Sequence, residues 1–161
     1  MPQQRFSIGA FAVIFDEHRR VLLCHRRDVD AWNLPGGGVE SGELPDQAAI
    51  RETKEEVGLE VEVERLVGVY GKPEKDEFIF AFHCRVVGGA LVATDESDEN
   101  RYFALDALPP NMSQKAAARI RDAAARHSQP IIRFQMEPSL RVEIQDPPRG
   151  HGSGSSGFFS A

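Results

Sequence analysis

Apolar residues occur along this chain in short stretches, and the first stretch, residues 6–15, is apolar on both of its faces. In an extended chain, alternate side chains point to opposite faces. Here both sets are apolar, namely Ile8, Ala10, Ala12 and Ile14 against Phe11, Val13 and Phe15. A strand of this kind is buried on both sides. The pattern therefore predicts a sheet that is covered on each face by another layer, which favours helices on both sides.

The next stretches predict a second strand and a helix. Residues 21–27 are typical of a strand, and the polar residues 16–19 before it predict a turn that joins the two strands in a hairpin. Pro45 suits the first position of a helix and Gly58 suits the residue after its end, so a helix is expected between them. Its N-cap would be Leu44, where Ser or Asp would be better by about 1 kcal/mol.

The remaining pattern predicts two long strands, a second helix that Ser113 can cap, and two short strands. The expected bounds are 59–69 and 78–87 for the long strands, 114–127 for the helix, and 131–134 and 140–144 for the short strands. A chain of 161 residues fits one domain, which we place at residues 1–130. Residues 131–161 are expected to form a C-terminal extension whose Gly- and Ser-rich end is flexible.

Composition narrows the class of protein. Hydrophobic residues make up 41% and charged residues 27%, as in an ordinary globular protein. No apolar run approaches the ~20 residues of a membrane helix, so no membrane partner is expected. Two cysteines, Cys24 and Cys84, do not make a disulfide framework, which predicts a reducing compartment and hence the cytoplasm. The net charge of −6 makes a nucleic-acid polymer an unfavourable partner, since phosphate contacts supply most of that affinity.

Negative charge is concentrated in one segment of the chain. Between Gly36 and Glu60 there are seven acidic and two basic residues, a balance of −5 out of the total of −6. On the expected helix, residues three or four apart share a face. Glu52 and Glu56 therefore lie in one row, with Glu55 beside them. The core-facing row consists of Ala49, Thr53 and Val57.

Three carboxylates this close repel one another, so they are either fully solvated or neutralised by a cation. A bare run of acids on a helix is usually a solvated face. Hard oxygen ligands select hard cations such as Mg²⁺, which also keeps water and binds substrate phosphates. The glycine-rich loop before the helix can bring its backbone close to the same point. Glu43 can reach Arg51 and hold this loop against the helix.

The spacing of these residues matches a known motif. Gly37 is followed after five residues by Glu43, after seven more by Arg51 and Glu52, and then by Glu55, Glu56, Gly58 and Leu59. The segment Gly37–Leu59 resembles the Nudix box over 23 residues and in eight of its nine specified positions. The exception is Thr53, where the family usually has an aliphatic residue. Because Thr53 lies in the core-facing row, this departure concerns packing and not chemistry.

The resemblance implies a fold and an activity. Nudix hydrolases are α/β proteins with an α/β/α sandwich around a mixed β-sheet, and they cleave a nucleoside diphosphate linked to another moiety. By similarity the domain covers residues 4–127. The implied cofactor is Mg²⁺, with Mn²⁺ as a substitute. The implied partner is a small-molecule nucleotide diphosphate, and a homodimer stays open.

The resemblance also implies which residues form the metal site. The metal ligands of the family map onto Glu52 and Glu56, usually together with Glu55 and the carbonyl oxygen of Gly37. The arginine of the box, here Arg51, and its first glutamate, here Glu43, correspond to residues that orient these ligands during catalysis.

A general base is also implied, because a proton must leave the attacking water. In the family this base is either a glutamate of the box, here Glu55, or a glutamate on a distant loop. The acidic turn at residues 95–99 looks like that loop. Glu99 is our candidate and Glu96 the alternative, while a solvated turn residue is the competing interpretation of Glu99.

Substrate choice has weaker signals. Pro73 lies 14 residues past Leu59, a distance similar to that of a proline in members that use ADP-ribose. ADP-ribose or a related nucleotide sugar is therefore the favoured substrate, with a turn proline as the competing interpretation of Pro73. Arg26 and Arg27 are candidates for binding phosphate, and ordinary surface charge explains them equally well.

Three aromatic residues are candidates for stacking on a base, and two Cys–His pairs are candidates for binding zinc. Trp32, Tyr70 or Phe78 can stack on a base, although each is more typical of a core. The adjacent pairs at residues 24–25 and 83–84 are poor zinc sites. Neighbours in a strand point to opposite faces, and the usual Cys-x-x-Cys spacing is missing.

Two alternative functions stay open at this point. One is a pyrophosphatase that acts on oxidised nucleoside triphosphates, with which the acidic turn at residues 95–99 is compatible. The other belongs to a different class and is a Nudix-fold module that senses a nucleotide without turnover. Such modules often lose glutamates of the box, whereas this chain keeps all of them.

Overall fold

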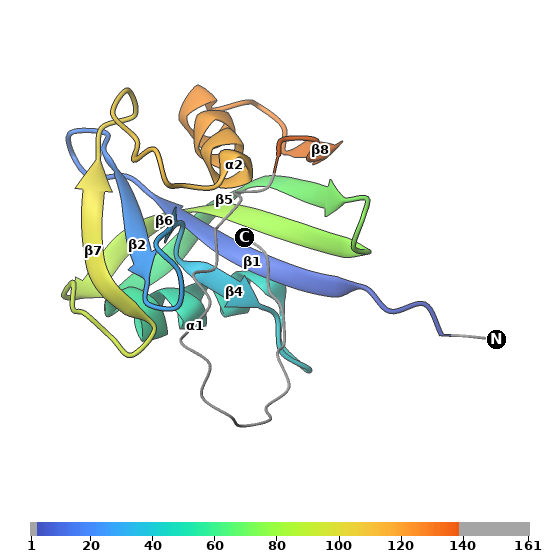
Figure 1. The fold of residues 1–161 in the computed structure, drawn as a ribbon, viewed down its shortest axis with the longest axis horizontal. Helices are drawn as coiled ribbons and strands as arrows, with labels where there is room; N and C mark the ends of the chain where they lie inside the picture. The colour runs from blue at the N-terminus through green and yellow to red at the C-terminus, as the bar shows by residue number, and fades with distance from the viewer. Residues whose placement is uncertain (1–2, 139–161) are drawn as a thin grey trace, which may run out of the picture.

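The computed structural model describes residues 3–138, which form two β-sheets and two helices (Figure 1). The strands of the larger sheet are β1 (Ser7–Ile14), β4 (Gly36–Gly38), β5 (Leu59–Lys72), β6 (Glu77–Gly89) and β8 (Ile131–Phe134). The strands of the smaller sheet are β2 (Val21–Arg26), β3 (Trp32–Asn33) and β7 (Ser97–Phe103). The helices are α1 (Pro45–Val57) and α2 (Gln114–Ala125).

The larger sheet is mixed, with the strand order β4-β1-β6-β5-β8. β1 runs parallel to β6 and antiparallel to β4, and β5 runs antiparallel to β6 and parallel to β8. The smaller sheet has the order β3-β2-β7 and is antiparallel throughout. These pairings confirm the expected α/β fold with a mixed sheet.

The expected hairpin between β1 and β2 is wrong. The two strands belong to different sheets and share only the isolated bridge between Phe15 and Val21. Both edges of β1 are already occupied by β4 and β6, so β1 is an interior strand. The polar turn does exist. Asp16 accepts hydrogen bonds from the backbone N–H groups of His18 and Arg20 at 3.0 and 2.8 Å, and the turn carries the chain from one sheet to the other.

The two faces of β1 contribute to two separate cores, as the alternating pattern predicts. On one face Ala10, Ala12 and Ile14 pack with apolar residues of α1, including Ala48 and Val57. On the other face Val13 packs with residues of α2, β5 and β6, which include Ala117, Ile120, Val67, Tyr70 and Ile79. Figure 1 shows α1 and α2 on opposite sides of the sheet. The helices therefore cover the two faces that the sequence requires to be covered.

The sheet continues past the domain boundary that we set at residue 130. Ile131 to Phe134 pair with β5 in the register Gly68↔Ile131 to Gly71↔Phe134. Gln135 is buried beside α2, where its side chain accepts hydrogen bonds from Arg119. We therefore propose that the domain ends after Gln135. The expected strand at 140–144 and the Gly- and Ser-rich end lie outside the described residues.

The helices agree with the expected positions but differ at their caps. α2 ends two residues earlier than expected, and the Ser113 side chain makes no capping hydrogen bond within residues 3–138. α1 has the predicted bounds, and Gly58 at its C-terminal end has φ 79°, a left-handed conformation that favours glycine. Neither described helix has the length and apolarity that a membrane span requires.

The start of α1 provides a test of the helix boundary. Leu44 occupies the N-cap with extended backbone angles and a side chain that is 62% exposed. Leucine cannot accept a hydrogen bond from the first turn, whereas serine can. Leu44→Ser should therefore stabilise the protein by about 1 kcal/mol and raise its melting temperature by roughly 3 °C. Thermal unfolding followed by circular dichroism measures the change.

Leu105→Ser is the matched control for this prediction, because Leu105 is also exposed but lies outside the helices. It should give no increase in melting temperature. A lower melting temperature for Leu44→Ser would mean that α1 begins at another residue.

Candidate active site

Three carboxylates from two distant parts of the chain meet at one point. Glu52 and Glu56 are one turn apart on α1, and Glu96 comes from the loop before β7. Each offers an oxygen atom, and these three oxygens lie within 4.8 Å of one another. We call these three residues the acid cluster. A set of three carboxylate oxygens fits a hard divalent cation such as Mg²⁺.

Glu56 is the most buried member of the acid cluster. Its Oε2 atom accepts hydrogen bonds from the backbone N–H of Gly36 at 3.3 Å and from the thiol of Cys24 at 3.4 Å. Burial raises the pKa of Glu56 to about 8, and the nearby charges of Glu52 and Glu96 act in the same direction. Burial also raises the pKa of Glu52. Both shifts show that negative charge is costly here in the absence of a cation.

The glycine at position 37 is explained by the close approach of Glu52. A Cβ atom built on Gly37 would lie 2.7 Å from the Oε1 atom of Glu52. Any side chain at this position would therefore displace the carboxylate. The short strand β4 holds Gly37 in place, because it pairs with β1 in the register Ala10↔Gly37.

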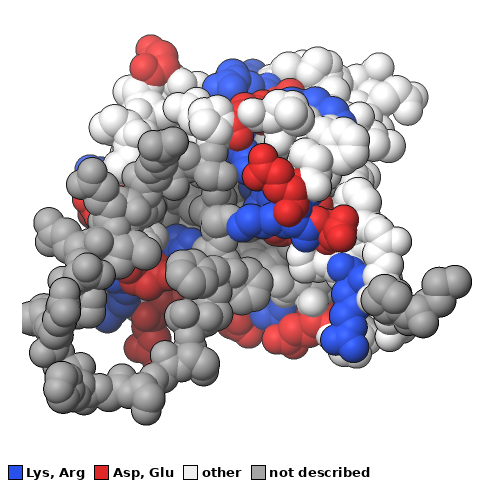
Figure 2. All heavy atoms as spheres, turned by 45° about the vertical axis from the view of Figure 1, so that its right-hand side comes forward, with Lys and Arg blue, Asp and Glu red and all other residues white. Residues whose placement is uncertain are grey.

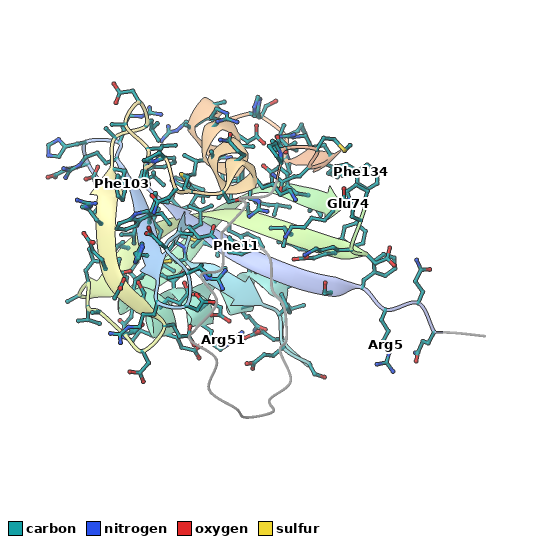
Figure 3. The ribbon with its side chains drawn as sticks, viewed as in Figure 1. Arg5, Phe11, Arg51, Glu74, Phe103 and Phe134 are labelled. Carbon is teal, nitrogen blue, oxygen red and sulfur yellow. The ribbon has the colours of Figure 1, made fainter. Side chains whose placement is uncertain are left out.

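Arg51, which is labelled in Figure 3, links the glycine-rich loop to the helix through its hydrogen bonds. Its Nε and Nη2 atoms donate to both carboxylate oxygens of Glu43 at 2.7 and 2.9 Å, and Nη2 also donates to the carbonyl oxygen of Gly38 at 3.1 Å. Its Nη1 atom donates to Glu52 at 3.0 Å and to Glu55 at 3.2 Å. The hydrogen bonds that Glu43 accepts from Arg51 and from the backbone N–H of Glu40 lower the pKa of Glu43 to about 2. The predicted contact between Glu43 and Arg51 is thus present, and it fixes the position of Glu52.

The acid cluster belongs to the wall of a cavity of about 540 Å³. This volume falls within the range of small-molecule binding sites. The predicted site residues that line the cavity are Arg26, Arg27, Gly37, Glu52 and Glu56. Those that do not line it are Glu43, Arg51, Glu55, Pro73 and Glu99.

Glu96, rather than our candidate Glu99, is the loop glutamate of the acid cluster. Glu96 precedes β7, whereas Glu99 lies within that strand, paired with His25, and its side chain contacts Arg101 at 3.5 Å. The sequence places both glutamates in one acidic turn and does not show that the strand begins at Ser97. That boundary decides which carboxylate reaches α1.

Glu55 and Pro73 also lie apart from the acid cluster. Glu55 is exposed and its carboxylate accepts a hydrogen bond from Arg51. Pro73 lies in the exposed turn between β5 and β6 and does not border the cavity. Pro73 therefore has no direct contact with the site.

The two arginines at the end of β2 differ in how they are held. The Arg26 side chain is paired with the carboxylate of Asp28 through two hydrogen bonds. Arg27 is exposed at the rim, and its backbone N–H donates to the carbonyl oxygen of Glu96 at 3.3 Å. Arg27 is therefore the arginine that is available to a ligand.

Of the aromatic and Cys–His alternatives, the three aromatic residues and the pair at residues 83–84 do not line the cavity, whereas Cys24 and His25 do. Trp32 and Tyr70 are core residues, while Phe78 is partly exposed and contacts Phe6. The two cysteines pack in the core beside α1, but His25 lies between Asp30 and Asp98 and His83 lies beside Glu64. In residues 3–138, the acid cluster is the one group of His, Cys, Asp or Glu side chains with metal-binding spacing.

Several cavity residues are not among the site residues expected from the sequence, and two of them have side chains suited to binding a ligand. Phe11 and Arg119 both line the cavity, from β1 and α2 respectively. Phe11 was assigned to a buried strand face and Arg119 was not singled out. An arginine within the alanine-rich helix was the available signal, because a charged residue near the predicted core row is unusual.

Comparison with known proteins decides the family. The model of the NUDIX domain matches residues 5–125 of this chain. The chain is a member of the Nudix family. This Nudix chain is 33% identical to a MutT-like protein of Streptomyces ambofaciens over 117 residues, which cover 73% of the chain and 76% of the relative.

Other relatives share part of their length with this Nudix chain. A protein of Methanocaldococcus jannaschii named ADP-ribose pyrophosphatase is 38% identical over 60% of the chain and 61% of its own length. A putative 8-oxo-dGTP diphosphatase of Bacillus subtilis is 36% identical over 55% of the chain and 59% of its own length.

Solved structures support the same fold. An ADP-ribose pyrophosphatase of Streptococcus suis superposes with a TM-score of 0.68 at 28% identity, covering 81% of this chain and all of the other. A NUDIX hydrolase of Nitrosomonas europaea superposes with a TM-score of 0.73 at 25% identity, covering 83% and 80% of the two chains.

The raised pKa of Glu56 predicts how stability depends on pH without metal. The pKa of Glu56 is about 8 in the folded chain and ordinarily 4.5. The protonated carboxyl therefore contributes to stability in full below pH 4.5, and this contribution is lost as the pH rises through about 8. In metal-free buffer, the melting temperature of the wild type should fall between about pH 5.5 and about pH 8.5 relative to that of Glu56→Gln.

Differential scanning calorimetry of both proteins across this range measures the difference. If the acid cluster holds a divalent cation, added Mg²⁺ should restore the wild-type melting temperature at the high-pH end, because a cation that binds the folded state stabilises it. Parallel pH profiles for the two proteins would contradict the assigned burial of Glu56.

Proposed function

We propose that this Nudix protein hydrolyses a nucleoside diphosphate linked to another moiety, in a reaction that depends on Mg²⁺, with Mn²⁺ as a substitute. The observation that carries the proposal is the acid cluster in the wall of a cavity of small-molecule size. A diphosphate is itself anionic and would be repelled by this wall. A divalent cation between the two removes the repulsion.

The metal site would be formed by the three carboxylates of the acid cluster. Glu52 is oriented by Arg51, and Glu56 is oriented by the backbone N–H of Gly36. We retain the carbonyl oxygen of Gly37 as a proposed further ligand, since Gly37 lies against Glu52. When bound, Mg²⁺ supplies neutralisation of phosphate charge and acidification of a water molecule.

Proton transfer is the role that we propose for Glu96. It is an exposed member of the acid cluster that offers one oxygen to the metal site, and its other carboxylate oxygen can accept the proton of a water that attacks phosphorus. Glu55 has a different proposed role. Its contact with Arg51 makes it a residue that helps to hold the arginine in place.

Phosphate binding is the role that we propose for Arg27. Arg27 is an exposed residue that lines the cavity, and its backbone N–H donates to the carbonyl oxygen of Glu96. Arg26 would contribute by fixing the end of β2, because its side chain is engaged with Asp28. Arginine suits this task because its planar fork pairs with phosphate oxygens.

Two substrate classes are supported by the names of relatives. ADP-ribose or a related nucleotide sugar is favoured by the proteins of Methanocaldococcus jannaschii and Streptococcus suis. A nucleoside triphosphate, oxidised or not, is favoured by the protein of Bacillus subtilis. A sensor without turnover is a third candidate, and the complete acid cluster argues against it.

The proposed partner is a small nucleotide in the cytoplasm. Figure 2 shows basic and acidic side chains intermixed on the face that carries the turn between β5 and β6, where a polymer-binding surface would show a continuous basic patch. Both cysteines are buried and unpaired, as expected of a protein in a reducing compartment.

The direct experiment is a substrate panel. The protein is incubated with Mg²⁺ and ADP-ribose, dinucleoside polyphosphates or nucleoside triphosphates, and the nucleoside monophosphate product is measured by chromatography. Formation of a monophosphate supports hydrolysis. Nucleotide binding without product from any substrate would favour the sensor.

Variants of two glutamates test the site in more detail. Glu56→Gln should abolish Mg²⁺-dependent turnover while the protein stays folded, because it removes a ligand. Glu96→Gln should lower kcat by about 10²-fold or more, because it removes the proposed base. Steady-state kinetics on the best panel substrate measures both effects.

Glu99→Gln is the matched control, since Glu99 is only three residues from Glu96 but lies within β7 and outside the acid cluster. It should keep kcat near the wild-type value. A loss for Glu99→Gln as large as that for Glu96→Gln would overturn the assignment of Glu96.

A further inference from the structure

One cavity wall holds a buried arginine that the proposed chemistry does not use. Arg119 of α2 lines the same cavity as the acid cluster, and only 2% of it is exposed. Burial lowers the pKa of Arg119 to about 10, so the side chain stays charged at neutral pH. A buried charge normally has an ionic partner. Within residues 3–138, no carboxylate lies within ion-pair distance of this guanidinium, and its hydrogen bonds go to an amide.

The amide partner leaves one edge of the arginine open. The Nε and Nη2 atoms of Arg119 both donate to the Oε1 atom of Gln135, at 3.0 and 2.7 Å. The Nε2 atom of Gln135 donates to the carbonyl oxygen of Lys115 at 3.0 Å, which fixes the orientation of the amide. An arginine carries five N–H donors. In the described part of the chain, the donors of Nη1 have no hydrogen-bond acceptor.

Aromatic rings restrict how a ligand can reach this edge. The guanidinium carbon of Arg119 lies 5.2 Å from the ring centre of Phe11 and 5.9 Å from that of Tyr70. The hydrogen bonds to Gln135 occupy the edge formed by Nε and Nη2, so among the described residues the edge formed by Nη1 and Nη2 is the one that keeps donors for a ligand. A ligand at this edge needs two acceptors in the plane of the arginine.

The rest of the cavity favours an uncharged acceptor group over another anion. Six acidic side chains and four Lys or Arg side chains line it, so it already carries an excess of negative charge. Ile8, Phe11 and Leu34 add apolar surface to the same lining. A flat group with apolar faces and a polar edge meets both conditions, and a nucleobase is such a group.

We infer that Arg119 selects a 6-oxopurine, guanine or hypoxanthine, as the base of the nucleotide substrate. The N7 and O6 atoms of such a base offer two in-plane acceptors to an arginine fork, whereas adenine presents an amino donor at the corresponding position. The inference rests on the proposed function, since the base belongs to the nucleotide whose phosphates meet the acid cluster. It favours inosine or guanosine nucleotides over adenosine nucleotides such as ADP-ribose.

A comparison of ITP with ATP tests this inference, because the two differ only in the C6 substituent and in the proton on N1 that the 6-oxo group brings with it. For the wild type, kcat/KM should be higher for ITP by roughly 5- to 150-fold, and GTP should behave like ITP. Arg119→Met should bring the ITP to ATP ratio close to one. Arg121→Met is the matched control, because Arg121 is an exposed residue of the same helix, and it should keep the wild-type ratio. A wild-type ratio of one or less overturns the inference.

Binding measurements separate this inference from the proposed function. Calorimetry compares IMP with AMP on the wild-type protein in the presence of Mg²⁺, where no turnover is needed. Tighter binding of IMP without hydrolysis of any nucleotide supports base selection and refutes the hydrolase. Hydrolysis of ITP and ATP at equal kcat/KM, with equal binding of IMP and AMP, supports the hydrolase and refutes base selection. If Arg119→Met does not fold, the wild-type comparison still decides.

Discussion

Three carboxylates held together, two of them withdrawn from water, are the constraint on which the rest of this structure depends. Repulsion and loss of hydration both raise the free energy of the charged state. Glu52 is partly compensated by Arg51, but among residues 3–138 Glu56 has only a backbone N–H and a thiol as donors. The protein therefore neutralises only part of the negative charge at the acid cluster, and a divalent cation neutralises the rest. This remaining negative charge links the fold to metal binding and, through the metal, to an anionic substrate.

The fold supplies the position of each carboxylate. α1 is fixed on the sheet by small and β-branched residues such as Ala48, Thr53 and Val57, and this packing turns Glu52 and Glu56 toward the cavity. Thr53 replaces the usual aliphatic residue without an unpaired hydroxyl, because its Oγ1 atom donates to the carbonyl oxygen of Ala49 at 2.7 Å. The loop before α1 is held by Arg51. Glu96 lies in the loop that leads into β7 of the smaller sheet, and this loop brings its carboxylate to α1.

Local features of this protein could be predicted from the sequence, and long-range features could not. The bounds of α1, its left-handed Gly58 and the contact between Glu43 and Arg51 depend on residues close in sequence, and all are present. The pairing of β1 with β6 joins residues about seventy positions apart, and the sequence favoured the nearer strand β2 instead. Loop closure over such distances leaves no local signal.

The same distinction holds within the site. Glu52 and Glu56 were predicted because one helix carries both. The sequence favours Glu99 over Glu96 because it does not show where β7 begins, and this boundary decides which of the two carboxylates lies near α1. Arg119 was not noticed because its role follows from the contact between α2 and the residues beyond β8.

The most direct test of this account is the position of a metal ion in crystals grown with Mn²⁺, read from anomalous diffraction. We expect a peak bonded to carboxylate oxygens of Glu52, Glu56 and Glu96, and we expect it to be missing in crystals of Glu56→Gln. A strong peak at any other group of residues, or none at the acid cluster in wild-type crystals, would contradict the central claim that these carboxylates form the metal site.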